Sequence, residues 1–114
     1  MKYMLLVCRD PAIELSPQDR TSMPGWVSSW VEEMDGRGVR LQGDLFQPAA
    51  DARTVRIRSG QRHVADGPFA DTPEQVGGYN IIDCATLDEA IEVAAQHPIA
   101  RFGSIEVRPF APDD

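Results

Sequence analysis

The chain has 114 residues, 42% hydrophobic and 25% charged, which is typical of one globular domain and not of a disordered chain. Its formal net charge of −7 argues against a protein that binds nucleic acid or an anionic membrane surface, since both usually present a basic face. Residues 1–9 form an apolar run too short to span a membrane and without the cleavage site of a signal peptide. We therefore expect a cytoplasmic protein with a single domain over residues 1–114.

The first third of the chain predicts a strand and a helix. Residues 1–9 are apolar on both sides, as in a central strand. Ser16 and Pro17 resemble a helix start, but Pro24 and the glycine after it would kink or break a helix, because proline lacks an N–H and clashes with the preceding turn. We therefore expect the main helix at about 24–35. Its buried stripe would consist of Val27, Trp30, Val31 and Met34.

The middle of the chain predicts a strand and a hairpin. Residues 39–45 contain spaced apolar side chains and predict a second strand. Residues 54–58 and 61–64 alternate around a Ser-Gly pair, which predicts a hairpin with a two-residue turn. Its valine and isoleucine would share one face, and its arginines the other.

The last third predicts a strand, a helix and a final strand. Residues 72–75 are expected to form one helical turn, and residues 78–84 a central strand. Thr86 to Glu89 is a capping box that begins a helix. His97 is expected to act as a cation at the end of this helix, and 104–108 to form a strand. The helix stripe would consist of Leu87, Ala90, Ile91, Ala94 and Ala95, and the tail 111–114 is expected to fray.

The order of these elements predicts the fold. Without the hairpin, the chain contains two βαβ units in tandem, the split βαβ or ferredoxin-like plan. This is an α+β fold with an antiparallel sheet, two helices on one face and an inserted hairpin. Apolar residues occupy both faces of the central strands, so one face stays uncovered in a single copy. We expect a second copy to pack on it, sheet to sheet, in a two-fold homodimer.

The sequence around Asp66 resembles a known family. The run Asp66-Gly67-Pro68-Phe69-Ala70-Asp71-Thr72, followed by Glu74 to Tyr79, is similar to the signature of YCII-related, or DGPF-domain, proteins. The opening of the chain and the closing Gly103 to Pro109 resemble this family too, so the similarity covers nearly the whole chain. It implies a ferredoxin-like homodimer of the dimeric α/β-barrel type and assigns no activity.

The resemblance also implies two functional contexts. Enzyme-like YCII relatives carry a histidine on the first helix with an aspartate near it as a proposed catalytic dyad. That histidine would fall near Trp26, and this chain has none there, which argues against the dyad chemistry. Other DGPF proteins are similar to products of genes beside extracytoplasmic-function sigma factors, which implies a regulatory or accessory role.

Asp66 and His63 are the candidate catalytic residues. Asp66 ends a strand and enters a Gly-Pro loop, where a partly desolvated carboxylate acts as a general base. The alternative is that Asp66 accepts backbone N–H bonds from Gly67 onward and only locks the turn. His63 lies three residues earlier, so it should point to the opposite strand face, and a solvent-facing histidine explains it equally.

Four residues are candidates for ligand binding. Tyr79 and Asp83 share a strand face and, with Phe69 and Trp26, would line a small pocket between sheet and helix. The alternative places the aromatic side chains in the core and Asp83 at a turn. No spacing predicts a metal site or a cofactor. The two cysteines, which fall in predicted strands, are expected to be buried free thiols.

Two functions follow from these patterns. The first is a small homodimeric protein that binds a small organic ligand beside Asp66, with cofactor-free lyase-like or isomerase-like acid–base chemistry, in which Tyr79 or His63 is the proton partner. The alternative is a non-catalytic accessory protein that acts with a sigma factor. A third hypothesis assigns the arginine-rich hairpin to contact with an anion or a protein partner.

Overall fold

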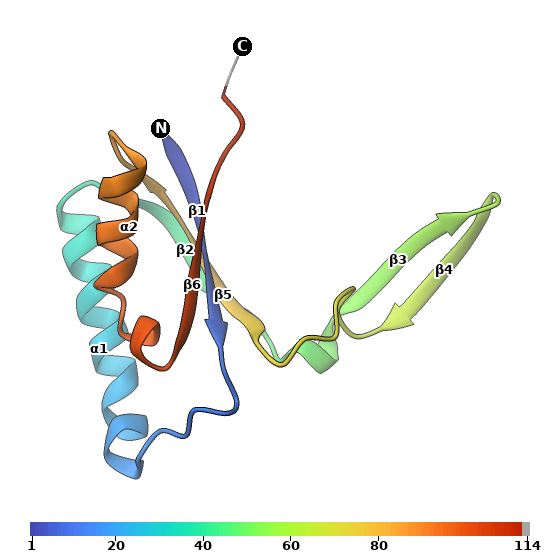
Figure 1. The fold of residues 1–114 in the computed structure, drawn as a ribbon, viewed down its shortest axis with the longest axis horizontal. Coiled ribbons are helices and arrows are strands. Elements are labelled where there is room, and N and C mark those ends of the chain that lie inside the picture. Colours follow the sequence, from blue (N-terminus) through green and yellow to red (C-terminus); the bar gives the residue numbers. More distant parts are fainter. Residues whose placement is uncertain (113–114) are drawn as a thin grey trace.

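The computed structural model describes residues 1–112 and contains a four-stranded sheet, two α-helices and a separate hairpin (Figure 1). The strands are β1 (Lys2–Arg9), β2 (Arg40–Leu45), β3 (Arg53–Arg58), β4 (Gln61–Asp66), β5 (Gln75–Asp83) and β6 (Gly103–Pro109). The helices are α1 (Pro17–Gly36) and α2 (Leu87–Ala95), with short 3-10 turns η1 (Ala49–Asp51) and η2 (Pro98–Arg101). Asp113 and Asp114, the end of the tail expected to fray, lie outside the described residues.

The sheet has the predicted topology. Its strand order is β2-β5-β1-β6, and every neighbouring pair is antiparallel. Helix α1 connects β1 to β2 and α2 connects β5 to β6, so each connection passes over one strand that lies between. This is the split βαβ plan, with β3 and β4 forming a sheet of their own. The predicted α+β fold with an inserted hairpin is confirmed.

Both helices cover the same face of the sheet and form the core with it (Figure 1). Alternate side chains of β1, Tyr3 and Leu5, point to this face and are fully buried. Trp30 and Met34 of α1 pack against them, as the helical stripe predicted. The other members of the core are Val39, Ile82, Cys84, Ala90, Val93 and Ala94.

The opposite face of the sheet, called here the open face, is apolar at its centre. Met4 pairs with Ile81 and Leu6 with Tyr79, and all four side chains are only half-buried. No helix within residues 1–112 covers them (Figure 1). Apolar side chains therefore occupy both faces of the central strands, as the sequence predicted.

Helix α1 begins seven residues earlier than predicted. It runs from Pro17 to Gly36 and passes through Pro24. The side chain of Ser16 accepts a hydrogen bond of 3.0 Å from the Asp19 N–H, which fixes the helix start. Pro24 removes only one internal N–H, and its side chain is exposed, so the helix continues across it.

The segment before β5 also differs from the prediction. Residues 72–75 form no helical turn, because Gln75 already pairs with Arg9 of β1. The Thr72 hydroxyl donates to the Glu74 carbonyl, 2.7 Å away, instead of capping a helix. Thr72 also precedes a proline, and this position disfavours helical backbone angles.

Helix α2 starts at the predicted capping box. The Thr86 hydroxyl accepts from the Glu89 N–H at 3.2 Å. Its buried stripe consists of Ala90, Val93 and Ala94, whereas Leu87 and Ile91 are 45% and 48% exposed. None of the helices in the described chain combines the length and the apolar character needed to cross a membrane.

The prediction for His97 is wrong. Its ring is only 4% exposed and lies 4.7 Å from the Trp30 ring in an edge-on contact. Its Nδ1 accepts a hydrogen bond of 3.1 Å from the Ile99 N–H and thereby caps η2. Burial lowers the pKa of His97 to about 4, so the ring is neutral at pH 7 and is not a helix-capping cation.

Candidate functional site

The two predicted catalytic residues lie on the hairpin of β3 and β4, called here the arm (residues 53–66). The Asp66 side chain is 89% exposed, and its Oδ1 lies 3.2 Å from the Arg53 Nε. His63 pairs with Arg56 on the other face of the arm. One chain therefore holds Asp66 and His63 on opposite faces, and their catalytic roles stay predictions.

The turn after Asp66 is held by other groups. Gly67 has a φ of 93°, and its N–H donates to the Ala52 carbonyl at 2.7 Å. The Thr54 hydroxyl donates to the Gly67 carbonyl at 2.8 Å. The alternative is therefore wrong for the Gly67 N–H, which donates to Ala52 and not to the Asp66 carboxylate, and the carboxylate reaches this turn only through its ion pair with Arg53.

The four predicted ligand-binding residues are spread over the chain. Tyr79 and Asp83 lie on the open face, with the Tyr79 ring stacked on Phe46 at 5.7 Å. Trp26 lies on α1, on the other side of the sheet, beneath the Arg101 guanidinium at 5.1 Å. Tyr79 and Asp83 therefore do not line a pocket between sheet and helix.

The remaining contacts of these residues agree with this separation. Asp83 Oδ1 lies 3.2 Å from the Met1 amino nitrogen, and Phe69 is 82% exposed in the loop after the arm. Trp26 lies on α1, Tyr79 and Asp83 lie on the other face of the sheet, and Phe69 is exposed in a loop, so a single chain does not bring the four together. Their role in ligand binding stays a prediction that needs a second copy.

The two cysteines are free, as predicted, but only Cys84 is buried as predicted, and Cys8 is partly exposed. Burial is the main cause that raises the pKa of both Cys8 and Cys84, which keeps them as thiols. Within residues 1–112, no three side chains of the kinds that bind metal ions (His, Cys, Asp or Glu) gather at one place.

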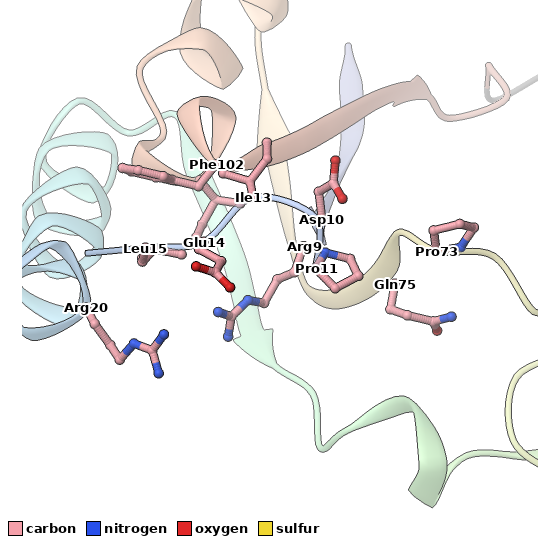
Figure 2. A pocket seen from close by; sticks show the side chains of 11 residues that line it. Arg9, Asp10, Pro11, Ile13, Glu14, Leu15, Arg20, Pro73, Gln75 and Phe102 are labelled. Atoms are coloured by element: carbon pink, nitrogen blue, oxygen red, sulfur yellow. The ribbon is translucent and has the colours of Figure 1, made fainter. Parts of the chain in front are cut away.

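A cleft of about 330 Å³ lies where β1 leads into α1. The connecting loop is folded on itself: Asp10 Oδ1 accepts from the Ala12 N–H at 2.9 Å, and the Ile13 N–H donates to the Asp10 carbonyl at 3.1 Å. The start of β5 and the turn before β6 form the other walls (Figure 2). The side chains that define its chemistry are Arg9, Ile13, Glu14, Leu15, Arg20 and Phe102.

The cleft combines two cations with an apolar wall. The side chains of Arg9 and Arg20 make no ion pair or hydrogen bond with any residue of the described chain. Figure 2 shows both guanidinium groups and the Glu14 carboxylate on the same side of the loop. Ile13 and Phe102 add apolar surface to the lining of the same cleft. A guanidinium without an internal partner can bind a carboxylate through two parallel hydrogen bonds.

Sequence reasoning did not find this cleft, because three segments far apart in the chain build it. Arg20 is the one residue whose position in the sequence could have indicated this cleft. It lies in the first turns of α1, where the helix dipole favours acidic side chains and disfavours a cation. A cation in that place indicates a role other than helix stability.

The family signature forms part of the cleft. Pro73 and Gln75 line it and belong to the segment from Asp66 to Tyr79 that carries the resemblance. Asp66 stands at the other end of that segment, where the arm ends. The signature therefore connects the arm to the cleft.

The fold and the cleft define a small α+β protein of the split βαβ plan with an inserted arm. Comparison with protein families gives the same result at finer detail: the YCII-related domain model matches residues 1–112, and the chain belongs to this family. It is 48% identical over 66 residues to the uncharacterized protein R00369 of Rhizobium meliloti (strain 1021). That match covers 56% of this chain, and the chain spans about half (53%) of the length of that relative.

Proposed function

We propose that this YCII-domain chain forms a homodimer that binds a small organic anion in the cleft beside Arg9 and Arg20. The observation that carries the proposal is the pair of arginines without internal partners at the edge of an apolar wall. The ligand would place a carboxylate between the guanidinium groups and an apolar portion against Ile13 and Phe102. The volume of about 330 Å³ is at the lower end of the range for small-molecule sites, which favours a compact ligand.

The charges of the cleft are unevenly placed, which supports an anion. Two arginines and two carboxylates, Asp10 and Glu14, line it, so their net charge is zero in a chain whose net charge is −7. Figure 2 shows the Asp10 carboxylate on the other side of the loop from Arg9, Arg20 and Glu14, so the side that these three share carries one net positive charge and attracts an anion. Glu14 would exclude ligands with a second carboxylate close to the first, because two like charges would then face each other.

The homodimer is supported by the open face. Full burial of an apolar side chain contributes roughly 1.5–3 kcal/mol, and Met4, Leu6, Tyr79 and Ile81 are all half-buried in one chain. A second copy packed on this face would bury the smaller part of these four side chains that is still exposed in each partner. The contribution is several kcal/mol, and polar residues at both sheet edges would form the rim.

Catalysis is the finer part of the proposal. Acid–base turnover with Asp66 as base and His63 or Tyr79 as proton partner requires a second copy, because one chain holds these side chains apart. Replacement of Asp66 by Asn separates the possibilities when melting temperature and ligand response are measured independently. A variant that changes only the melting temperature would exclude the catalytic role.

Isothermal titration with benzoate, and with benzamide as the uncharged match, tests the cleft. We expect benzoate to bind and benzamide to bind at least tenfold more weakly, since the loss of a charge-assisted pair corresponds to about 1.4 kcal/mol or more. Arg9→Gln and Arg20→Gln should each raise the Kd of benzoate at least tenfold. The control is Arg37→Gln, which removes an exposed arginine at the end of α1, outside the cleft.

Two results would contradict this proposal. One is an equal benzoate affinity in all three arginine variants. The other is no measurable binding of benzoate at millimolar concentration. The alternative function, an accessory protein for an extracytoplasmic-function sigma factor, is favoured by one observation, the exposed arm. A pull-down with such a sigma factor that Arg56→Glu abolishes would support it.

A further inference from the structure

The arm has no support from its own chain. Thr54 is its one partly covered residue, and all its other residues are exposed. Val55, Ile57 and Val64 share one face of the arm, called here its apolar face, and are 61%, 59% and 53% exposed. Arg62 pairs with Ile57 and lies on this face as well, as does Arg53, so the prediction that the arginines occupy the other face holds only for Arg56 and Arg58. The radius of gyration is 16.2 Å, whereas a compact chain of this length has about 13 Å. The arm is thus an apolar surface held away from the body of the molecule.

A hairpin of this kind needs a partner. A lone two-stranded hairpin is at best marginally stable in water, because it buries too little apolar surface. The turn of this arm is well formed, with φ of 52° at Ser59 and 74° at Gly60, as a two-residue hairpin turn requires. Turn geometry alone does not supply the missing burial, so the apolar face of the arm indicates a docking surface.

Charge indicates what the arm docks on. The arm contains four arginines and one aspartate, a net charge of +3. The rest of the chain therefore carries −7 minus +3, which is −10. Complementary charge favours association between the arm and the body of another copy. The arm points away from its own body, so this attraction is available between copies (Figure 1).

The direction of the arm fits the same partner. It leaves the sheet on the side opposite α1 and α2, the side of the open face (Figure 1). Packed sheets lie about 10 Å apart, whereas a six-residue strand extends about 20 Å. A second copy packed on the open face would therefore lie within reach of the arm, which is long enough to pass the partner's sheet and reach its helix layer.

We propose that the arm is a clasp between two copies of this chain, with Val55, Ile57 and Val64 docked on the partner and the positive charge of the arm attracted to the negatively charged body of the partner. The inference rests on the proposed homodimer and identifies the arm as the segment that stabilises it. In a two-fold dimer each chain packs its arm on its partner, so the same contact is made twice.

A shortened arm tests the clasp. Thr54 and Ala65 face each other in register, so Val55–Val64 can be replaced by Asn-Gly, a pair that closes two-residue hairpins. Sedimentation equilibrium should show that this change raises the dimer Kd at least tenfold. Far-UV circular dichroism should show an unchanged helical signal, since the deleted residues belong to neither α1 nor α2.

A matched pair of point variants locates the docking face. Ile57→Asp and Gln61→Asp add the same charge near the tip, on opposite faces of the arm. Ile57→Asp should raise the dimer Kd at least tenfold, and Gln61→Asp less than threefold. Equal effects of the two variants would overturn the assignment of the apolar face as the docking face.

Hydrogen exchange separates failure of the clasp from failure of the dimer. Protection of the arm amides that is present in the dimer and lost on dilution to monomer supports the clasp. A stable dimer with unprotected arm amides, and with a Kd unchanged by the shortened arm, overturns the clasp and leaves the dimer standing. A monomer at 100 µM overturns both the clasp and the homodimer, because the arm then has no second copy to bind. Benzoate binding still tests the cleft in that case.

Discussion

His97 makes the stability of this protein depend on pH in a defined window. Its buried ring has a pKa of about 4, whereas an exposed histidine has 6.5. Between these values the unfolded chain binds a proton that the folded chain does not, so stability rises with pH. The contribution of the neutral ring is fully present above pH 6.5 and is lost as the pH falls to about 4.

The size of this effect follows from the two pKa values. Their difference, 6.5 minus about 4, corresponds to roughly 3 kcal/mol when the whole window is crossed. The part of it that falls between pH 7 and pH 4.5 is about 2 kcal/mol. We expect His97→Asn to remove this part, since asparagine does not titrate and its side-chain oxygen can accept the Ile99 N–H in place of Nδ1.

Urea denaturation at pH 7, 5.5 and 4.5, at one protein concentration, measures the effect. At pH 7 the variant should be less stable, because it loses the contact with the Trp30 ring. That deficit should shrink by about 2 kcal/mol at pH 4.5, since only the wild type loses stability through His97. His63→Asn is the control, because it removes the other histidine from an exposed site. A deficit that stays constant from pH 7 to 4.5 would refute the reasoning.

Two further predictions concern close approaches and thiols. Gly43→Ala should destabilise the chain by about 1–3 kcal/mol, because its Cβ would lie 2.6 Å from the Tyr79 carbonyl oxygen and against the Asn80 side chain. Gly25→Ala lies in open space on α1 and should stabilise the chain by about 0.5–1 kcal/mol. Urea denaturation at pH 7 measures both, and the same sign for the two would contradict the packing at Gly43. Cys8 and Cys84 should react with a thiol reagent at pH 7 at least tenfold more slowly in the native protein than in urea, because burial raises their pKa. Equal rates in the two states would show that neither thiol is protected.

The sequence predicted those features of the fold that local patterns encode. The Ser-Gly turn and the alternation around it predicted the arm, and Thr86 with Glu89 predicted the start of α2. Pro24 misled the prediction for α1, because the penalty for one lost hydrogen bond is local, whereas the cap at Ser16 and the packing of the helix decide its length.

Other features depend on contacts between distant segments, which no local pattern reports. His97 is buried because Trp30, from the other helix, packs against it. Arg40 provides a second example: its guanidinium binds the buried Asn80 at 2.8 Å and Asp35 at 3.1 Å across three elements. The cleft beside Arg9 belongs to the same class, since it forms only when the loop after β1 meets β5 and the turn before β6.

The segment from Asp66 to Tyr79 has three structural roles, so Asp66 alone could not predict where the cleft lies. Its first residue ends the arm, its middle forms the rim of the cleft, and its end pairs with β1 and β2 in the sheet. Gly78 is required in that last part, because a Cβ there would lie 2.9 Å from the Asp44 carbonyl oxygen of β2. The pairing of Gln75 with Arg9 then ties the cleft rim to the sheet and not to the arm. A change confined to the arm should therefore alter assembly without altering the cleft, so the two proposals can fail independently.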